Sequence, residues 1–235
     1  MTNNTMKLYV FDSCPYCVRV RMLAALKNIP LEIVTFPLGQ WPEEVAEKIE
    51  KTTVPMLEMH EPATGESRFI QDSTEILMIL DGMNGAPMLD GYQSSQALQN
   101  WFDDVKGTTS ALCYPRMPFL SLPELSSEKA LAMFSGMIEG KLGVTLEQAL
   151  AKTGEYTSVV AEHLQTLADV LQAETLVNGE RAVSMDDIHA FPELRNLMMV
   201  AELELPKALL RYMDYLSAQT GITLYVKVNA EGALI

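Results

Sequence analysis

Cysteine and histidine are both scarce in this chain, whose 235 residues contain three of each. Three cysteines are too few, and odd in number, for a fold held together by disulfides, and two of them form one C-x-x-C, Cys14 and Cys17. A structural zinc site normally needs four Cys or His ligands. The other candidate ligands are not paired at ligand spacing: Cys113, His60, His163 and His189. Cysteine usage therefore favours a dithiol reaction in a reducing, cytoplasmic compartment, and we expect no metal.

Basic residues and long apolar runs are also in short supply. Lys and Arg number 17 against 31 Asp and Glu, which gives a net charge of −14 and argues against non-specific binding to nucleic acid. The apolar runs are far shorter than a membrane span, and the polar segment 1–5 lacks the basic and apolar regions of a signal peptide. Apolar residues still make up 48% of the chain, enough for a sizeable core. We expect a folded protein that does not act on membranes.

The first 84 residues alternate between strand and helix patterns. Short apolar or β-branched runs predict strands at 8–11, 31–36, 55–59 and 67–70. Helix-forming segments lie between and after them, at 15–28, 43–51 and 73–83. The last two strands flank a turn-rich segment and are predicted to form a hairpin. The resulting order is βαβαββα, an α/β domain over residues 1–84.

The remainder of the chain has mostly helical patterns. Residues 85–93 are dense in turn formers and are predicted to be a linker. Helices are predicted at 94–106, 126–139, 145–152, 155–173, 185–200 and 206–219, with a proline-broken loop at 115–123. The tail, 223–228, alternates like a strand but could equally be an extended arm on the surface. Strands followed by a run of helices indicate an α/β domain and then an all-helical domain over 94–235.

The C-x-x-C stands where a strand leads into a helix, the context of a thiol–disulfide redox site. Cys14 at the helix start would face unpaired backbone N–H groups and the positive end of the helix dipole, both of which favour thiolate. Cys17 lies one turn further on, where it could resolve a mixed disulfide formed at Cys14. Arg19 and Arg21 add positive charge, but the more frequent role for such residues is a solvated helix face.

Three motifs together resemble a known family. They are Cys14-Pro15-Tyr16-Cys17, then Thr53-Val54-Pro55, then Gln71-Asp72-Ser73 at a helix start. The first half resembles the glutathione-binding thioredoxin fold of glutaredoxins, and the helical second half is similar to glutathione transferases. The whole chain most resembles type 2 glutaredoxins, which are built like glutathione transferases.

That resemblance implies a glutathione site. Pro55 would be a cis-proline facing the active cysteines, and the backbone of Val54 would hold the cysteinyl part of glutathione as a strand-like pair. Asp72 and Ser73 would hold the γ-glutamyl end, since a helix N-terminus with a hydroxyl suits its carboxylate and an acid suits its ammonium. Tyr16 is included in the same site.

Two helix starts also carry capping patterns. Asp72 could be an N-cap completed by Glu75, a role that can coexist with ligand binding. Asp72 is also one methylene shorter than the Glu commonly found there in the family. Ser184 and Asp187 have the spacing of a capping box, and the resemblance implies the same structural role at a buried helix of the second domain.

The function implied is a glutathione-dependent thiol–disulfide oxidoreductase. Cys14 would attack mixed or protein disulfides, Cys17 would be dispensable for mixed disulfides with glutathione, and glutathione would be the reducing co-substrate. The expected partners are glutathione and disulfide-bonded or glutathionylated proteins, and the expected state is a monomer. The alternatives are a glutathione transferase, which has no need of the second cysteine, and a transferase-like binding module.

Overall fold

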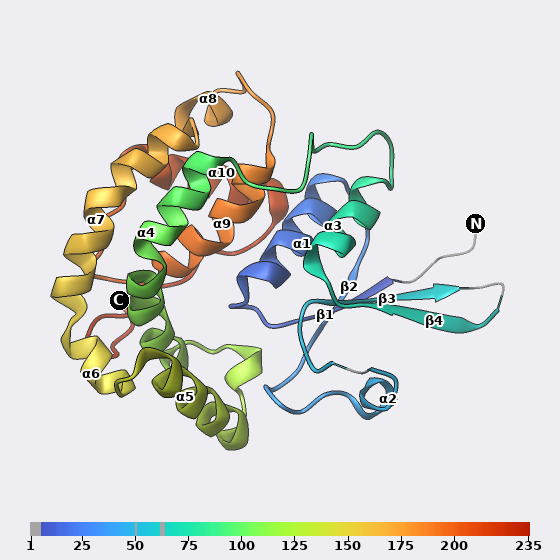
Figure 1. The fold of residues 1–235 in the computed structure, drawn as a ribbon, viewed down its shortest axis with the longest axis horizontal. Coiled ribbons are helices and arrows are strands. Elements are labelled where there is room, and N and C mark those ends of the chain that lie inside the picture. The colour runs from blue at the N-terminus through green and yellow to red at the C-terminus, as the bar shows by residue number, and fades with distance from the viewer. Residues whose placement is uncertain (1–5, 50, 62–63) are drawn as a thin grey trace.

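The structure is a computed structural model that describes residues 6–49, 51–61 and 64–235. A four-stranded sheet with its helices forms the N-terminal domain, and the helical C-terminal domain packs beside it (Figure 1). The fold class predicted from the sequence is confirmed.

The sheet has the strand order β2-β1-β3-β4. Its strands are β1 (Met6–Val10), β2 (Glu32–Thr35), β3 (Met56–Glu61) and β4 (Glu66–Ile70). β1 pairs in parallel with β2 and antiparallel with β3, and β3 and β4 form the expected hairpin. The helices of this domain are α1 (Pro15–Leu26), α2 (Glu43–Ala46) and α3 (Ser73–Asp81). α1 and α3 pack against each other beside the sheet (Figure 1).

α2 is shorter than the charged helix predicted at 43–51. Its regular part ends at Ala46, and Val45 is its one buried residue. A helix of one turn with a single buried side chain gains little from packing, and short helices depend on packing for stability. Residue 50, inside the predicted helix, lies outside the described residues.

Most of the C-terminal domain was predicted as the structure has it. It consists of α4 (Gln96–Cys113), the 3₁₀ segments η1 (Tyr114–Phe119) and η2 (Pro123–Leu125), α5 (Glu128–Leu142), α6 (Leu146–Ala151), α7 (Thr153–Val170), α8 (Ala173–Val177), α9 (Met185–Leu197) and α10 (Lys207–Thr220). α4 runs well past the predicted end at residue 106, because its second half also packs on α7 and buries Ala111 and Leu112. α8 was missed: it is separated from α7 by Gln172, whose φ is 45°.

The predicted linker and tail are both fixed to the protein body. Asp81 at the end of α3 accepts the backbone N–H groups of Met88 and Leu89 at 2.8 and 3.2 Å. The tail is an extended arm whose pairing consists of isolated bridges at Val228, so the strand alternative does not hold. The fully buried Arg116 donates to the Val228 carbonyl at 3.0 Å and holds this arm against the domain.

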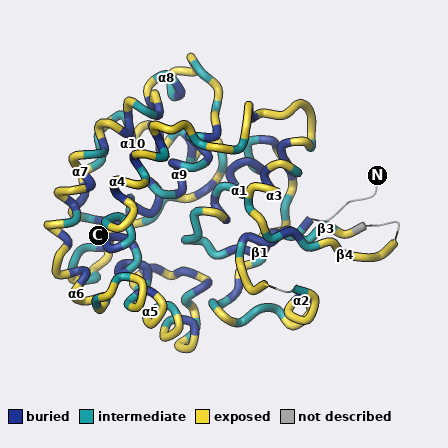
Figure 2. Tube along the Cα trace, viewed as in Figure 1, coloured by how far each residue is buried: buried dark blue, intermediate teal, exposed yellow. Residues whose placement is uncertain are grey.

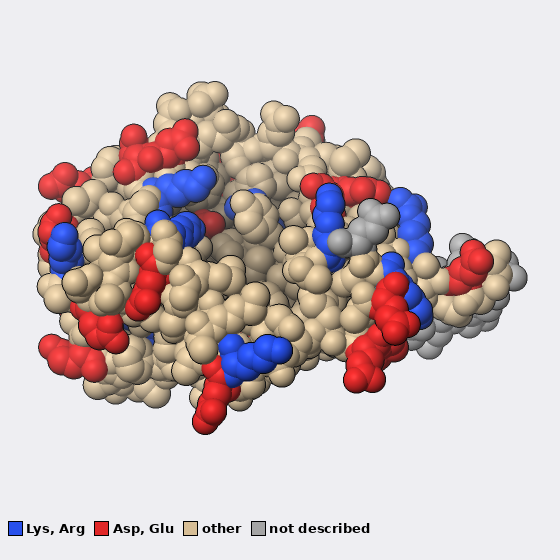
Figure 3. Space-filling view, turned by 60° about the horizontal axis from the view of Figure 1, so that its bottom comes forward, with Lys and Arg blue, Asp and Glu red and all other residues tan. Residues whose placement is uncertain are grey.

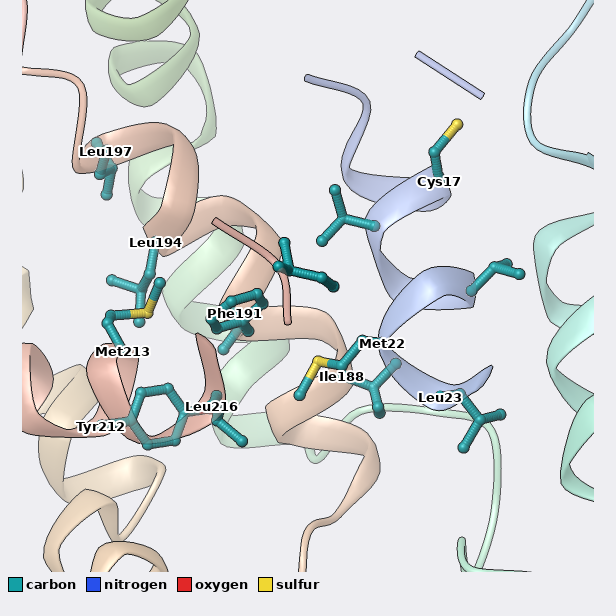
Figure 4. Close-up of a cluster of buried hydrophobic side chains, with 14 of the residues drawn as sticks. Cys17, Met22, Leu23, Ile188, Phe191, Leu194, Leu197, Tyr212, Met213 and Leu216 are labelled. Atoms are coloured by element: carbon teal, nitrogen blue, oxygen red, sulfur yellow. The ribbon is translucent and has the colours of Figure 1, made fainter. Parts of the chain in front are cut away.

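The two domains share one hydrophobic core. Buried side chains of α1 meet those of α9 and α10 in a single cluster, which runs through the middle of the molecule (Figures 2 and 4). Its labelled members include Met22 and Leu23 from α1, Ile188 and Phe191 from α9, and Tyr212 from α10. Because α1 begins at the C-x-x-C, the C-terminal domain directly supports the helix that presents the cysteines.

Candidate redox site

Three loops that carry the predicted site residues meet at one end of the sheet. Tyr9 of β1 lies opposite Met56 of β3, and Leu57 lies opposite Ile70 of β4. The end of β1, the start of β3 and the end of β4 are therefore neighbours. The C-x-x-C follows the first, Val54-Pro55 precedes the second, and Asp72-Ser73 follows the third.

Cys14 and Cys17 differ sharply in environment. Cys14 is the N-cap of α1 and is half-buried, whereas Cys17 is 0% exposed; both are free thiols. The Cys17 thiol donates to the Cys14 sulfur and lowers the pKa of Cys14. The backbone N–H groups of Cys17 and Tyr16 lower it further, against burial and the Glu124 charge, which raise it. Burial and the neighbouring Cys14 raise the pKa of Cys17 well above its usual range. The site therefore holds one activated thiol and one shielded proton donor.

The Val54–Pro55 peptide bond is cis, as the resemblance implies. In the described part of the chain, no backbone hydrogen bond engages Val54, so its N–H and C=O are available to a strand-like ligand. Gln71 Nε2 donates to the carbonyls of Lys51 and Thr53 at 2.6 and 3.1 Å and so fixes the loop before the cis bond. The sequence had given Gln71 no such role.

Asp72 is the N-cap of α3, with its Oδ1 accepting the Glu75 N–H at 2.8 Å. The N-cap is confirmed. The capping box with Glu75 is not formed among the described residues, where the Glu75 carboxylate pairs with Arg68 at 2.9 Å. The exposed Asp72 carboxylate keeps a second oxygen for a ligand. Ser73 opens the same helix and is half-buried. Tyr16 is 53% exposed beside Cys14. The glutathione-binding roles of these residues and of Val54 remain predictions.

A carboxylate from the C-terminal domain holds the loop before Cys14, residues 12–13. Glu124 in η2 is 4% exposed. It accepts the backbone N–H of Asp12 at 3.1 Å, the backbone N–H of Ser13 at 2.8 Å and the Ser13 hydroxyl at 2.7 Å. These are the two residues before Cys14, so Glu124 fixes the backbone that leads into the C-x-x-C. Its negative charge also opposes ionisation of Cys14.

Two residues of α9 also donate hydrogen bonds to this loop. The buried Arg195 donates to the Asp12 carbonyl and to its carboxylate, both at 2.8 Å, and Asn196 donates to the Ser13 carbonyl at 3.2 Å. Burial alone would raise the pKa of Asp12, but Arg195, together with Arg21 and Tyr225, lowers it to about 2. The loop before Cys14 is therefore locked by charged contacts across the domain boundary. These partners lie more than 100 residues away in the sequence, and no local motif marked them.

The expectation that Arg19 and Arg21 lie on a solvated face was wrong. Arg21 pairs with Asp12 at 2.8 Å, and its side chain is mostly buried. The Arg19 guanidinium lies over the Tyr16 ring, 4.6 Å from its centroid, and 4.0 Å from Glu193 of α9. Both arginines face the C-terminal domain, because α1 is sandwiched between α3 and α9 rather than exposed along one side.

The capping box at α9 is present. The Ser184 N–H donates to Asp187 at 2.7 Å. The Asp187 carboxylate is fully buried and also receives Arg181 at 2.7 and 2.8 Å and the Tyr212 hydroxyl at 2.9 Å. All of these contacts lie within the C-terminal domain, which favours a structural role.

The remaining singled-out residues have structural surroundings. Cys113 is buried, and burial raises its pKa well above the usual range. His189 Nδ1 contacts the Ser94 hydroxyl, and the His163 carbonyl accepts the Trp101 indole N–H at 2.9 Å. Within residues 6–49, 51–61 and 64–235, no cluster of His, Cys, Asp and Glu could hold a metal ion. Nor is any helix in these ranges long and apolar enough to cross a membrane.

Comparison with known proteins agrees with this geometry. Residues 97–229 match the family model "Glutaredoxin 2, C terminal domain", and residues 8–87 match "Glutathione S-transferase, N-terminal domain". Glutaredoxin 2 of Escherichia coli K12 is 33% identical over 219 residues, 93% of this chain and 97% of that protein.

Solved structures give the same relationship. The crystal structure of glutaredoxin 2 from Salmonella typhimurium, in complex with glutathione, is 32% identical, with a TM-score of 0.83 over 94% of this chain and 97% of that one. A glutathione transferase from Phanerochaete chrysosporium shares the fold, with a TM-score of 0.65 at 15% identity over 92% of this chain and 97% of the other. By both its sequence and its two-domain architecture, the chain belongs to the glutaredoxin 2 family.

Proposed function

We propose that the protein is a glutathione-dependent thiol–disulfide oxidoreductase in which Cys14 is the nucleophile. The observation that carries this proposal is the asymmetry of the cysteine pair. Cys14 stands at the helix start with a lowered pKa, and the buried Cys17 keeps its proton. Because thiolate is the form that attacks disulfides, this difference supports Cys14 as the residue that makes the first attack.

For a glutathionylated substrate, the reaction needs one enzyme thiol. The Cys14 thiolate attacks the glutathionyl sulfur, a Cys14–glutathione disulfide forms, and the substrate sulfur leaves and takes up a proton. The thiolate of a second glutathione then attacks that disulfide, which releases glutathione disulfide and restores the Cys14 thiolate. The net reaction converts one mixed disulfide and one glutathione into one free thiol and one glutathione disulfide.

For a protein disulfide, Cys17 takes part. Cys14 first forms a mixed disulfide with the substrate, and Cys17 then attacks Cys14, so that the substrate leaves as a dithiol. Two glutathiones reduce the resulting Cys14–Cys17 disulfide. Burial raises the pKa of Cys17 most, and the neighbouring Cys14 raises it further; a mixed disulfide at Cys14 removes the second of these effects.

The glutathionyl group would lie across the three loops at the end of the sheet. The free backbone of Val54 would pair with its cysteinyl residue. Ser73 and the backbone N–H groups at the start of α3 would take its γ-glutamyl carboxylate. Asp72 would take the ammonium with the oxygen that the capping bond leaves free. Tyr16 would cover the glutathionyl sulfur from the exposed side.

Single cysteine substitutions test the proposal. With glutathione as reductant and a small glutathione mixed disulfide as substrate, Cys14→Ser should abolish turnover, and Cys17→Ser should retain much of it. Cys113→Ser is the matched control, since this buried thiol has no role in the scheme, and it should behave as wild type. Full activity in Cys14→Ser would refute the proposal. Conjugation of glutathione to an aryl halide by the wild type, without disulfide reduction, would favour a transferase instead.

We further propose a monomer acting in the cytoplasm on glutathionylated or disulfide-bonded proteins. The supporting observation for the compartment is the use of cysteine: all three thiols are free, and two form the reactive pair. The monomeric state is carried over from the family resemblance. Light scattering at micromolar concentration would test it, and a mass twice that of the 26.1 kDa chain would contradict it.

A further inference from the structure

A cavity of about 290 Å³ opens beside the C-x-x-C, between α1 of the first domain and α4 of the second. Figure 3 shows a hollow between the two domains, with Lys and Arg side chains on its rim. Pro15 and Tyr16 border the cavity, so a molecule inside it would lie next to Cys14. Its apolar lining includes the rings of Trp101, Phe102 and Tyr114.

The cavity carries more positive than negative charge, in a chain of net charge −14. Arg19, Lys106 and Lys141 border it, against Asp103 and Glu193. Burial raises the pKa of Glu193 above its usual value, against the lowering effect of Arg19 and the two lysines. The lining therefore has one more cationic than anionic side chain.

The cations of the cavity have few charged partners. In the described ranges, Lys106 and Lys141 form no ion pair. Lys141 lies over the Tyr114 ring, 4.6 Å from its centroid, and its Nζ donates to the Tyr114 hydroxyl at 3.2 Å. The buried Nε of Arg19 has no hydrogen-bond partner among the described residues, and the one carboxylate near its guanidinium is 4.0 Å away. Cationic side chains beside aromatic rings suit a carboxylate attached to an apolar or aromatic group.

We propose that this cavity is a substrate subsite that accepts an acidic residue close to the reacting cysteine of a glutathionylated protein. The inference rests on the proposed function and names the class of protein substrate that the site prefers. The net negative charge of the enzyme is largely screened beyond about 8 Å at physiological ionic strength. Distant acidic residues of the enzyme therefore oppose an acidic residue in the cavity less than the net charge of −14 suggests.

The cavity is separate from the place assigned to glutathione. The predicted glutathione contacts Val54, Asp72 and Ser73 do not border it, and they lie across Cys14 on the side of β3 and α3. Tyr16 alone belongs to both. A glutathionylated peptide could thus place its glutathionyl half at the end of the sheet and its peptide half in the cavity between the domains.

Two peptides and two enzyme variants test the subsite. The peptides have the same length and one glutathionylated cysteine, flanked by Glu in one and by Gln in the other. Lys106→Gln/Lys141→Gln removes two exposed cavity cations, and Lys129→Gln, an exposed lysine of α5 outside the cavity, is the matched control. The measured quantities are kcat/KM for each peptide and KM for glutathione, at low and at physiological salt.

The wild type and Lys129→Gln should prefer the acidic peptide about fivefold at low salt, as expected for two partly screened charge pairs. The double variant should lose this preference and keep its rate on the neutral peptide and its KM for glutathione. An equal preference in the double variant, or none in the wild type, would overturn the subsite. A raised KM for glutathione with the peptide preference intact would overturn it too, by assigning the cations to glutathione. Failure of the wild type to turn over either peptide would refute the proposed function itself, and the subsite with it.

Discussion

Asp187→Ala should destabilise the protein strongly while leaving its redox chemistry intact. The fully buried carboxylate receives the Ser184 N–H, the Tyr212 hydroxyl and both terminal nitrogens of Arg181. A buried donor left without its acceptor costs about 1–3 kcal/mol, and breaking a buried ion pair costs about 3–5 kcal/mol. Arg181 is 20% exposed and keeps bonds to backbone carbonyls, so water and these carbonyls recover part of the loss. We expect a net loss of about 4 kcal/mol.

A loss of that size is a large fraction of the roughly 5–15 kcal/mol that stabilises a typical domain. For a chain of this length it corresponds to a fall in Tm of about 10 °C. Thermal and denaturant unfolding measure the loss, with Asp214→Ala, an exposed residue of α10, as control; its free energy of unfolding should change by less than about 0.5 kcal/mol. Turnover is compared below both transitions. Normal melting of Asp187→Ala with abolished turnover would show that the carboxylate acts in the chemistry instead.

Two further predictions concern charge near the active site. Glu124→Gln removes a charge that opposes ionisation of Cys14, so the pH profile of Cys14 alkylation by iodoacetamide should move to lower pH; an unchanged or higher midpoint would contradict the assigned effect. The same change leaves one loop N–H poorly paired and should cost about 1–3 kcal/mol of stability. Burial and Arg19 lower the pKa of His189 from 6.5 to about 4, so the unfolded state binds more protons between these values. The contribution of His189 to the free energy of unfolding should therefore fall by about 1–2 kcal/mol from pH 6.5 to pH 4, since a partly solvated imidazole realises only part of the shift. In urea titrations, His189→Gln should reduce the dependence of the free energy of unfolding on pH in this range. The same pH dependence in variant and wild type would refute the prediction.

The parts of the site that were predictable depend on local sequence. The redox pair Cys14 and Cys17 was predicted from the C-x-x-C spacing and from the strand before it and the helix after it. The cis bond at Pro55 came from the family resemblance and not from the residues alone. The N-cap at Asp72 followed from side-chain chemistry within one helical turn.

The residues that hold the loop before Cys14 were not predictable from one sequence. Glu124 follows the loop 115–123, in which prolines were the only feature recognised. Arg195 lies within a predicted helix, and nothing in the sequence indicated a hydrogen-bond partner for it. Their hydrogen bonds to Asp12 and Ser13 join positions 112 and 183 residues apart, and only the packing of the two domains brings them together. The length of α4 and the extended tail were set in the same way, by contacts with α7 and with Arg116.

Glutathionylation of the Cys17→Ser variant tests the central assignment most directly. Without Cys17, a mixed disulfide at Cys14 cannot be resolved within the protein and should accumulate when the variant meets glutathione disulfide at neutral pH. Mass spectrometry of the digested protein should find one glutathionyl group, located on Cys14 and removed by free glutathione. The group on Cys113, or an unmodified Cys14, would contradict the account.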